Sequence, residues 1–132
     1  MAYAPEHLEA AKQCATESVI LLQNNNNTLP LKSAKTILVT GPMADAPYDQ
    51  LGTWAFDGEE QYTVTPLKAM AAHFNVINVP TLSYSRDTNT AGFKAAQKAA
   101  KKADAIVVCV GEEAILSGEA HCLSQLNLQG AQ

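Results

Sequence analysis

Three short apolar runs constrain the fold of this chain more than any other feature of its sequence. Thr36–Thr40 is β-branched, apolar on both sides and closed by Gly41-Pro42, a pattern typical of a strand buried on both faces. Residues 75–79 and 105–110 form two further strand-like runs. Because such strands occur in parallel sheets covered by helices, the sequence predicts a sheet of three parallel strands.

Helical patterns alternate with these strands. Residues 5–23 begin with Pro5 at a helix-opening position and place small and apolar side chains at three- and four-residue steps, which predicts an amphipathic helix. Thr65 is expected to cap a second helix that runs as far as Phe74, and residues 90–102 are expected to form a third. The alternation predicts an α/β fold in three layers, a parallel sheet with helices on both faces.

The sheet that these patterns predict is thin. A chain of 132 residues has room for one compact unit, and three strands with three main helices are few for an α/β domain. We therefore expect a truncated fold in a piece of a longer protein. We interpret residues 1–35 as a leading helix and connector, and residues 36–132 as the N-terminal part of an incomplete α/β domain.

The composition argues against several classes of function. Nine Lys and Arg stand against 13 Asp and Glu, which gives a net charge of −4 with no basic stripe, so we expect no nucleic-acid partner. No apolar run approaches the roughly 18 residues of a membrane span, and we expect no membrane partner. The three cysteines are far apart and form no CxxC pair, which argues against a disulfide framework and against a zinc site. The sequence contains no GxGxxG, GxxxxGK[ST], HExxH or GxSxG motif, so we expect neither a cofactor nor a metal.

The candidate functional residues follow the first and third predicted strands. If the strand at residues 36–40 lies between the other two, its following loop and the loop after residue 110 meet where open α/β sheets bind ligands. Carboxylates at such an edge suit acid–base chemistry, because burial and a second carboxylate can separate their pKa values. The candidates in these two loops are Asp45, Asp49, Trp54, Glu112, Glu113, Glu119 and His121.

The same residues have plainer interpretations. The glutamates can be solvated loop charges, and His121 can be an ordinary surface histidine. Trp54 can stack on the apolar face of a sugar ring or cap the core. Asp45 can cap a turn, as aspartates after Gly-Pro often do. The residue types alone leave these alternatives open.

Several segments, in order along the chain, resemble the C-terminal α/β sandwich domain of glycoside hydrolase family 3, which includes β-glucosidases and β-xylosidases. The segment Thr40-Gly-Pro-Met-Ala-Asp45 is similar to the GPNAD turn of that domain, although Met43 stands where Asn is usual. Leu51-Gly-Thr-Trp54 is similar to its LGGW or GSW segment, with Thr53 where Gly or Ser is usual. The other segments that carry the resemblance are residues 15–24, 27–31 and 107–112.

The resemblance implies a retaining glycosidase in which this sandwich supplies the general acid/base and a separate TIM barrel supplies an Asp nucleophile. It assigns the acid/base to Glu119, with Glu113 as runner-up, and it assigns substrate binding to Trp54 and Asp45. Trp54 would stack on the leaving-group sugar. The chain has neither a Ser-Asp pair for the nucleophile motif nor the eight βα repeats of a barrel.

From the resemblance we expect a β-linked glucoside or oligosaccharide as the substrate of the parent enzyme. The parent would be periplasmic or extracellular, and the isolated chain would be inactive. Two other functions stay open. The chain could be a non-catalytic α/β module that binds a carbohydrate or a partner protein, and the open edges of its sheet could lead to self-association.

Overall fold

The computed structural model describes residues 3–132. The chain divides into two compact units, one that ends at Lys32 and one that spans Ser33–Gln132. The candidate residues all lie in the second unit. Within residues 3–132, no helix has the length and apolar character that a bilayer span requires.

The first unit contains the helix α1 (Pro5–Ser18), which has Pro5 in its first turn, as predicted. The predicted end of this helix at residue 23 was wrong, because Val19 already has an extended backbone. The Ser18 hydroxyl donates to the carbonyl of Ala15 at 2.8 Å, a local bond that competes with helix continuation. The β-branched residue that follows, Val19, also favours an extended chain.

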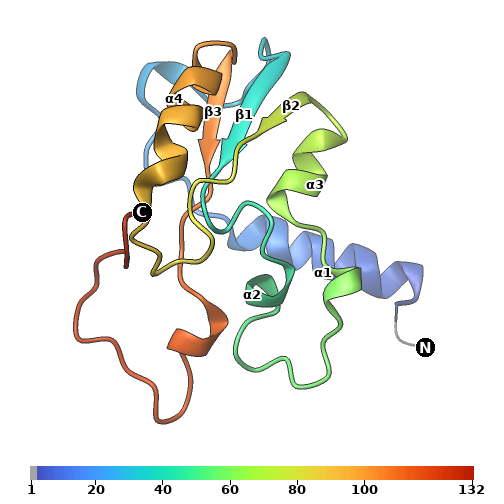
Figure 1. Ribbon diagram of the computed structural model, residues 1–132. Coiled ribbons are helices and arrows are strands. Elements are labelled where there is room, and N and C mark those ends of the chain that lie inside the picture. Colours follow the sequence, from blue (N-terminus) through green and yellow to red (C-terminus); the bar gives the residue numbers. More distant parts are fainter. Residues whose placement is uncertain (1–2) are drawn as a thin grey trace. The chain divides into compact units, whose positions relative to one another are not determined.

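The second unit is built on the predicted parallel sheet (Figure 1). Its strands are β1 (Thr36–Thr40), β2 (Asn75–Asn78) and β3 (Ala105–Val108), in the order β2-β1-β3. Both pairings are parallel, with Leu38 of β1 opposite Ile77 and Ile106. The central position of β1 meets the condition under which the two candidate loops lie at one edge, and it explains why its side chains from residue 37 to residue 40 are buried.

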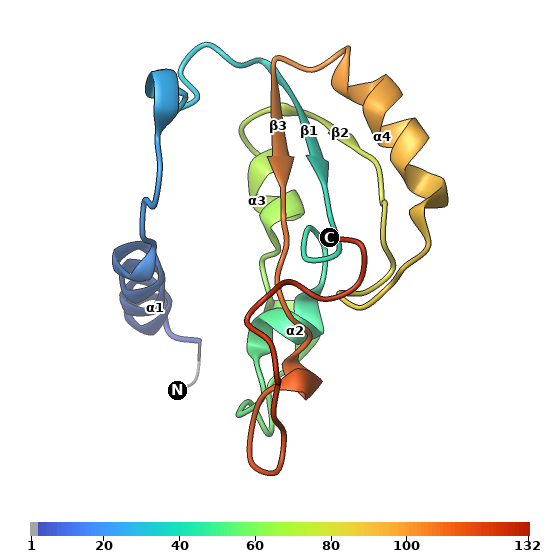
Figure 2. The ribbon, with the colours of Figure 1, turned by 90° about the vertical axis from the view of Figure 1, so that its left-hand side faces the viewer.

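Helices cover both faces of the sheet, which confirms the three-layer α/β fold. On one face, Ile37 and Val39 pack near Leu67 and Met70, which belong to α3 (Pro66–Ala71). On the other face, Leu38 borders a groove that Phe93 and Ala96 of α4 (Phe93–Ala100) also line. Figure 2 shows α3 and α4 on opposite sides of the sheet. Successive side chains of β1 therefore point to opposite faces of the sheet, one toward α3 and the next toward α4.

The helices of the second unit differ from the prediction at their ends. Thr65 caps α3 as predicted, since its hydroxyl oxygen accepts the Lys68 N–H at 3.3 Å. The helix ends at Ala71, so that Phe74 lies beyond it but still packs on the core. The third predicted helix starts as a 3-10 turn, Thr90–Gly92, before α4. A short helix that was not predicted, α2 (Pro47–Leu51), lies in the loop after β1.

Candidate functional site

The loops after β1 and β3 leave the sheet at the same edge (Figure 1). The two loops are in contact near their first residues, because the Met43 N–H donates to the Cys109 carbonyl at 3.1 Å. Gly41 makes this approach possible. It has φ +99°, and a Cβ at this position would lie 2.2 Å from the Cys109 carbonyl oxygen, so no larger residue fits without moving the backbone. The two candidate loops are therefore held together where they begin.

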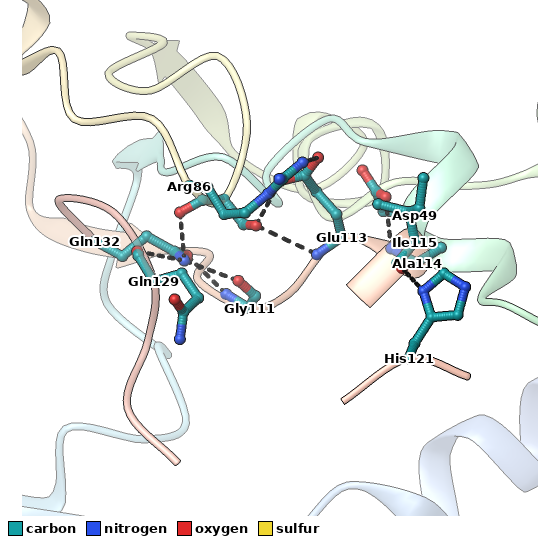
Figure 3. Close-up of polar contacts among 10 residues, drawn as sticks. Asp49, Arg86, Gly111, Glu113, Ala114, Ile115, His121, Gln129 and Gln132 are labelled. Atoms are coloured by element: carbon teal, nitrogen blue, oxygen red, sulfur yellow. Dashed lines mark hydrogen bonds and ion pairs between the residues drawn. The ribbon is translucent and has the colours of Figure 1, made fainter. Parts of the chain in front are cut away.

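Glu119 lies in the loop after β3 and is exposed. The turn around it is closed by the His121 N–H, which donates to the Gly118 carbonyl at 3.1 Å. The His121 ring is also fixed, because Nδ1 lies 2.6 Å from the Ile115 carbonyl oxygen. A carbonyl only accepts, so Nδ1 is the donor. Figure 3 shows this contact of His121 with Ile115. Through it, His121 supports the turn that carries Glu119.

Trp54 lies beside this turn. A Cβ on Gly118 would be 4.0 Å from Trp54 Cζ2 and 2.6 Å from the methyl group of Thr53, which places the residue before Glu119 against the Trp54 loop. Trp54 is 60% exposed, so it does not cap the core. Its ring meets that of Phe56 edge to face, with the centroids 6.3 Å apart, an arrangement that orients the indole.

Glu113 has a different environment, which Figure 3 shows. Its carboxylate receives two bonds from Arg86, at 3.0 Å from Nε and 3.2 Å from an Nη, and one from the buried Ser85 hydroxyl at 2.7 Å. The Arg86 guanidinium holds the pKa of Glu113 below its usual value. Glu113 is therefore kept as a carboxylate in a built ion pair.

Asp45 is tied to the start of α3. One of its carboxylate oxygens accepts the Thr65 hydroxyl at 2.7 Å, and Thr65 is itself the cap of that helix. Asp45 therefore fixes the side chain that caps α3. Glu112, in the loop after β3, is exposed.

The Gln132 side chain lies against the start of the loop after β3 (Figure 3). Its side-chain oxygen accepts the Gly111 N–H at 2.9 Å, and its Nε2 donates to the carbonyls of Gly111 at 2.9 Å and Ser85 at 3.0 Å. The Gln132 side chain therefore ties its own segment to Gly111, where the loop after β3 starts, and to Ser85.

Several residues that build the site were missed by the sequence analysis or given no role there. Arg86, Ser85 and Gln132 carried no local signal, since each acts through partners far away in the sequence. Asp49 was noted only as a loop carboxylate and Thr53 only as a departure from a motif. Within the described residues, no group of three or more His, Cys, Asp or Glu side chains is placed to hold a metal ion.

Fold and site together define an α/β module in which two loops meet at the carboxyl edge of a parallel sheet, where such folds bind ligands. A family model described as "Glycosyl hydrolase family 3 C-terminal domain" matches residues 19–132. The chain therefore belongs to this family.

Relatives and solved structures agree with this assignment. The periplasmic beta-glucosidase of Salmonella typhimurium is 30% identical over an alignment of 149 residues. The alignment covers 96% of this chain and 20% of that protein. An exo-1,4-beta-xylosidase of Aspergillus niger is 34% identical over 114 residues, covering 82% of this chain and 14% of the relative. The crystal structure of a beta-glucosidase from Listeria innocua in complex with isofagomine matches with a TM-score of 0.88 at 29% identity, over 97% of this chain and 18% of that one. A mutant of the Listeria innocua enzyme in complex with laminaribiose gives the same TM-score, 0.88.

The chain spans no more than a fifth of each of these proteins, from 14% to 20% of their length.

Proposed function

We propose that this chain supplies the general acid/base and part of the leaving-group subsite of a retaining β-glycosidase of the β-glucosidase or β-xylosidase type. In this proposal the nucleophile lies on a TIM barrel outside the chain. The observation that carries the proposal is the contact between the turn of Glu119 and the loop of the exposed Trp54. A carboxyl group and an aromatic face side by side are what acid-assisted departure of a sugar requires.

The chemistry of Glu119 follows in two steps. As an acid, Glu119 gives its proton to the glycosidic oxygen while the nucleophile attacks the anomeric carbon, which forms a glycosyl-enzyme intermediate. As a base, the Glu119 carboxylate then takes a proton from the water that hydrolyses this intermediate. The two carboxyl groups of such a site lie roughly 5–5.5 Å apart, so both domains are needed. Trp54 would hold the departing sugar.

The environment of Glu113 supports the choice of Glu119 as the acid. A general acid must carry a proton before the reaction, and the pKa of Glu113 is lowered by Arg86. Both of its oxygens already accept hydrogen bonds. Glu119 is exposed at the turn and is available to a substrate that approaches Trp54.

The remaining parts of the proposal concern the domain and its ligands. We propose that residues 1–35 lead into the domain, that residues 36–132 form its first part, and that Asp45 adds to substrate binding from the loop after β1. The substrate of the parent enzyme would be a β-linked glucoside or oligosaccharide. The beta-glucosidase structures with bound isofagomine and laminaribiose support this class of ligand. We further propose that the chain by itself is inactive and self-associates.

The test compares Glu119→Ala with Glu113→Ala in the longer protein that carries this chain and the barrel. Glu119→Ala should lower kcat/KM for an alkyl β-glucoside by about 10²–10⁴-fold, the loss expected for missing acid catalysis. An aryl glucoside with a good leaving group needs little protonation, so its kcat/KM should be nearly spared. Its turnover at saturation should fall, because the second step lacks its base. Added azide, which needs no deprotonation, should restore this turnover and give a β-glycosyl azide.

Glu113→Ala should show no azide rescue. Azide rescue in the Glu113 variant alone would move the acid/base to Glu113. If neither variant changes the dependence on the leaving group while sugar binding persists, the chain is a non-catalytic binding module.

A further inference from the structure

We infer that Asp49 and Thr53 are positioning residues, which lock the turn of Glu119 against Trp54. We call their hydrogen bonds to the loop after β3 the clamp. The inference rests on the proposed role of Glu119 and adds residues to that site that neither the family match nor the sequence motifs assign.

The clamp grips both ends of a single 3-10 turn, Ala114–Leu116. The Asp49 carboxylate accepts the Ala114 N–H at 2.9 Å. The Thr53 hydroxyl lies within hydrogen-bond reach of two carbonyls, those of Ala114 and Ser117, the second at 2.8 Å. These contacts join residues more than 60 positions apart in the sequence, so the loops after β1 and β3 are fixed to each other well beyond their shared start at the sheet edge.

The clamp also sets the position of the residue before Glu119. Gly118 has φ +124° and packs against the Thr53 methyl group, with no room for a Cβ, which would lie 2.6 Å away. Thr53 therefore touches the loop with both branches of its side chain. Trp54 is its chain neighbour, so the same backbone segment that carries the aromatic face also holds the acid.

A general acid is effective only when its carboxyl group is held in the right place. A proton is transferred efficiently only when donor and acceptor oxygens reach about 2.6–3.2 Å, and a displacement of about 1 Å can cost on the order of 10²-fold in rate. Glu119 lies in an exposed turn and has no ion pair such as Glu113 has with Arg86 among the described residues. Its position must come from the backbone, and the clamp is what fixes that backbone.

The experiment uses the longer protein and the pair Thr53→Val and Thr53→Ser. Thr53→Val keeps the branched shape and the contact with Gly118 but removes the hydroxyl, whereas Thr53→Ser keeps the hydroxyl. Thr63→Val is the matched control, because Thr63 Oγ1 is buried without a hydrogen-bond partner in the described part of the chain. The readout is kcat/KM for an alkyl β-glucoside and for a dinitrophenyl β-glucoside, which isolates the contribution of acid catalysis.

We expect Thr53→Val to lower kcat/KM for the alkyl substrate about tenfold and for the dinitrophenyl substrate less than about twofold, since only the first requires a placed proton. Thr63→Val should behave like the unmodified protein with both substrates. Thr53→Ser keeps the hydroxyl but loses the methyl contact with Gly118, so its loss with the alkyl substrate should be smaller than that of Thr53→Val. A purely structural role for Thr53 would lower both rates together, and that result would overturn the inference.

A second pair covers the case in which Thr53→Val fails to fold. Asp49→Asn keeps an oxygen that can accept the Ala114 N–H, whereas Asp49→Leu does not. Asp49→Leu should give the same selective loss with the alkyl substrate and should speed hydrogen exchange of the Ala114 amide in the full chain. Asp49→Asn should neither lower kcat/KM for the alkyl substrate nor speed hydrogen exchange of the Ala114 amide. Equal behaviour of the two variants would contradict the clamp.

Glu119→Ala, measured beside these variants, separates the two hypotheses. If Glu119→Ala shows the selective loss and Thr53→Val and Asp49→Leu do not, the clamp is wrong and the proposed function stands. If Glu119→Ala shows no selective loss, the proposed function falls, and the clamp loses its role with it.

Discussion

Two glutamates in one loop have opposite surroundings at the scale of single residues. Glu113 is bound by Arg86 through two hydrogen bonds and is largely shielded from solvent, with 14% of its side chain exposed. Glu119 is exposed at the turn. Glu113 is held as a carboxylate and has a structural role. Its ion pair holds the segment of Arg86 against the loop after β3.

The ion pair predicts a pH dependence of stability. The pKa of Glu113 is lowered from 4.5 in the folded chain, chiefly by Arg86, so the unfolded state binds more protons in the acidic range. The stabilisation is fully present above about pH 4.5, the unfolded value, and is lost as the pH falls through the folded pKa. Glu113→Gln should flatten this decline in the free energy of unfolding, measured by urea denaturation of the full chain at several pH values.

Arg86→Gln is the matched variant for this prediction, because it removes the partner and leaves Glu113 in place. It should flatten the same decline. An unchanged pH dependence in Arg86→Gln would show that the ion pair does not set the pKa of Glu113.

At the scale of elements, α3 depends on one buried side chain. Thr65 is 0% exposed, its hydroxyl oxygen accepts the Lys68 N–H, and its proton is donated to Asp45. The helix spans only Pro66–Ala71, too short to form without its cap and its packing. The cap therefore connects the loop after β1 to one whole layer of the fold.

Thr65→Ala should lower the free energy of unfolding by about 1–2 kcal/mol, the usual cost of losing a helix cap. Thr65→Ser keeps the hydroxyl, so its free energy of unfolding should fall much less. Urea denaturation of the full chain measures both variants, and a loss below about 0.5 kcal/mol in Thr65→Ala would contradict a capping role.

The elements also show what sequence reasoning can and cannot predict. The strands and the cap of α3 were predicted because their signals are local, a β-branched run and a Thr-Pro pair. The short helix α2 was not predicted, since five residues carry little periodicity and Asp49 in it makes its contact with Ala114, far along the chain. The site was predicted in outline, as two loops at one edge, whereas the partners of Glu113 depend on tertiary contacts that no local pattern reveals.

At the scale of the whole chain, one face of the sheet is not fully covered. Ile106, Val108 and Val110 are 53%, 57% and 42% exposed. Ile106 and Val108 lie on β3, which is an edge strand, and all three residues line the apolar groove beside α4. An apolar row on an open edge favours association of chains.

We predict that the isolated chain self-associates and that Ile106→Lys combined with Val108→Lys reduces the association, because charges on an edge strand oppose pairing. Sedimentation velocity over a range of concentrations measures the effect. Leu126→Lys, at a fully exposed position outside the sheet, is the control. A strictly monomeric unmodified chain would contradict the prediction.

The isolated chain should also fail to hydrolyse an aryl β-glucoside above background. An acid/base without its nucleophile cannot form the glycosyl-enzyme intermediate. Release of nitrophenol over several hours, with Glu119→Ala as the comparison, tests this. Turnover by the unmodified chain that disappears in Glu119→Ala would place a nucleophile within these 132 residues.

The hydrogen bonds of Gln132 to the start of the loop after β3 make part of the segment between them exchangeable. The Gln132 amide joins its own segment to Gly111 and to Ser85, and residues 122–128, beyond Glu119 and His121, are exposed. Insertions or deletions there change the rim of the site without pulling on the sheet, because the hydrogen bonds of Gln132 stay in place. A graft of residues 122–128 between relatives should therefore leave the sheet and its helices intact.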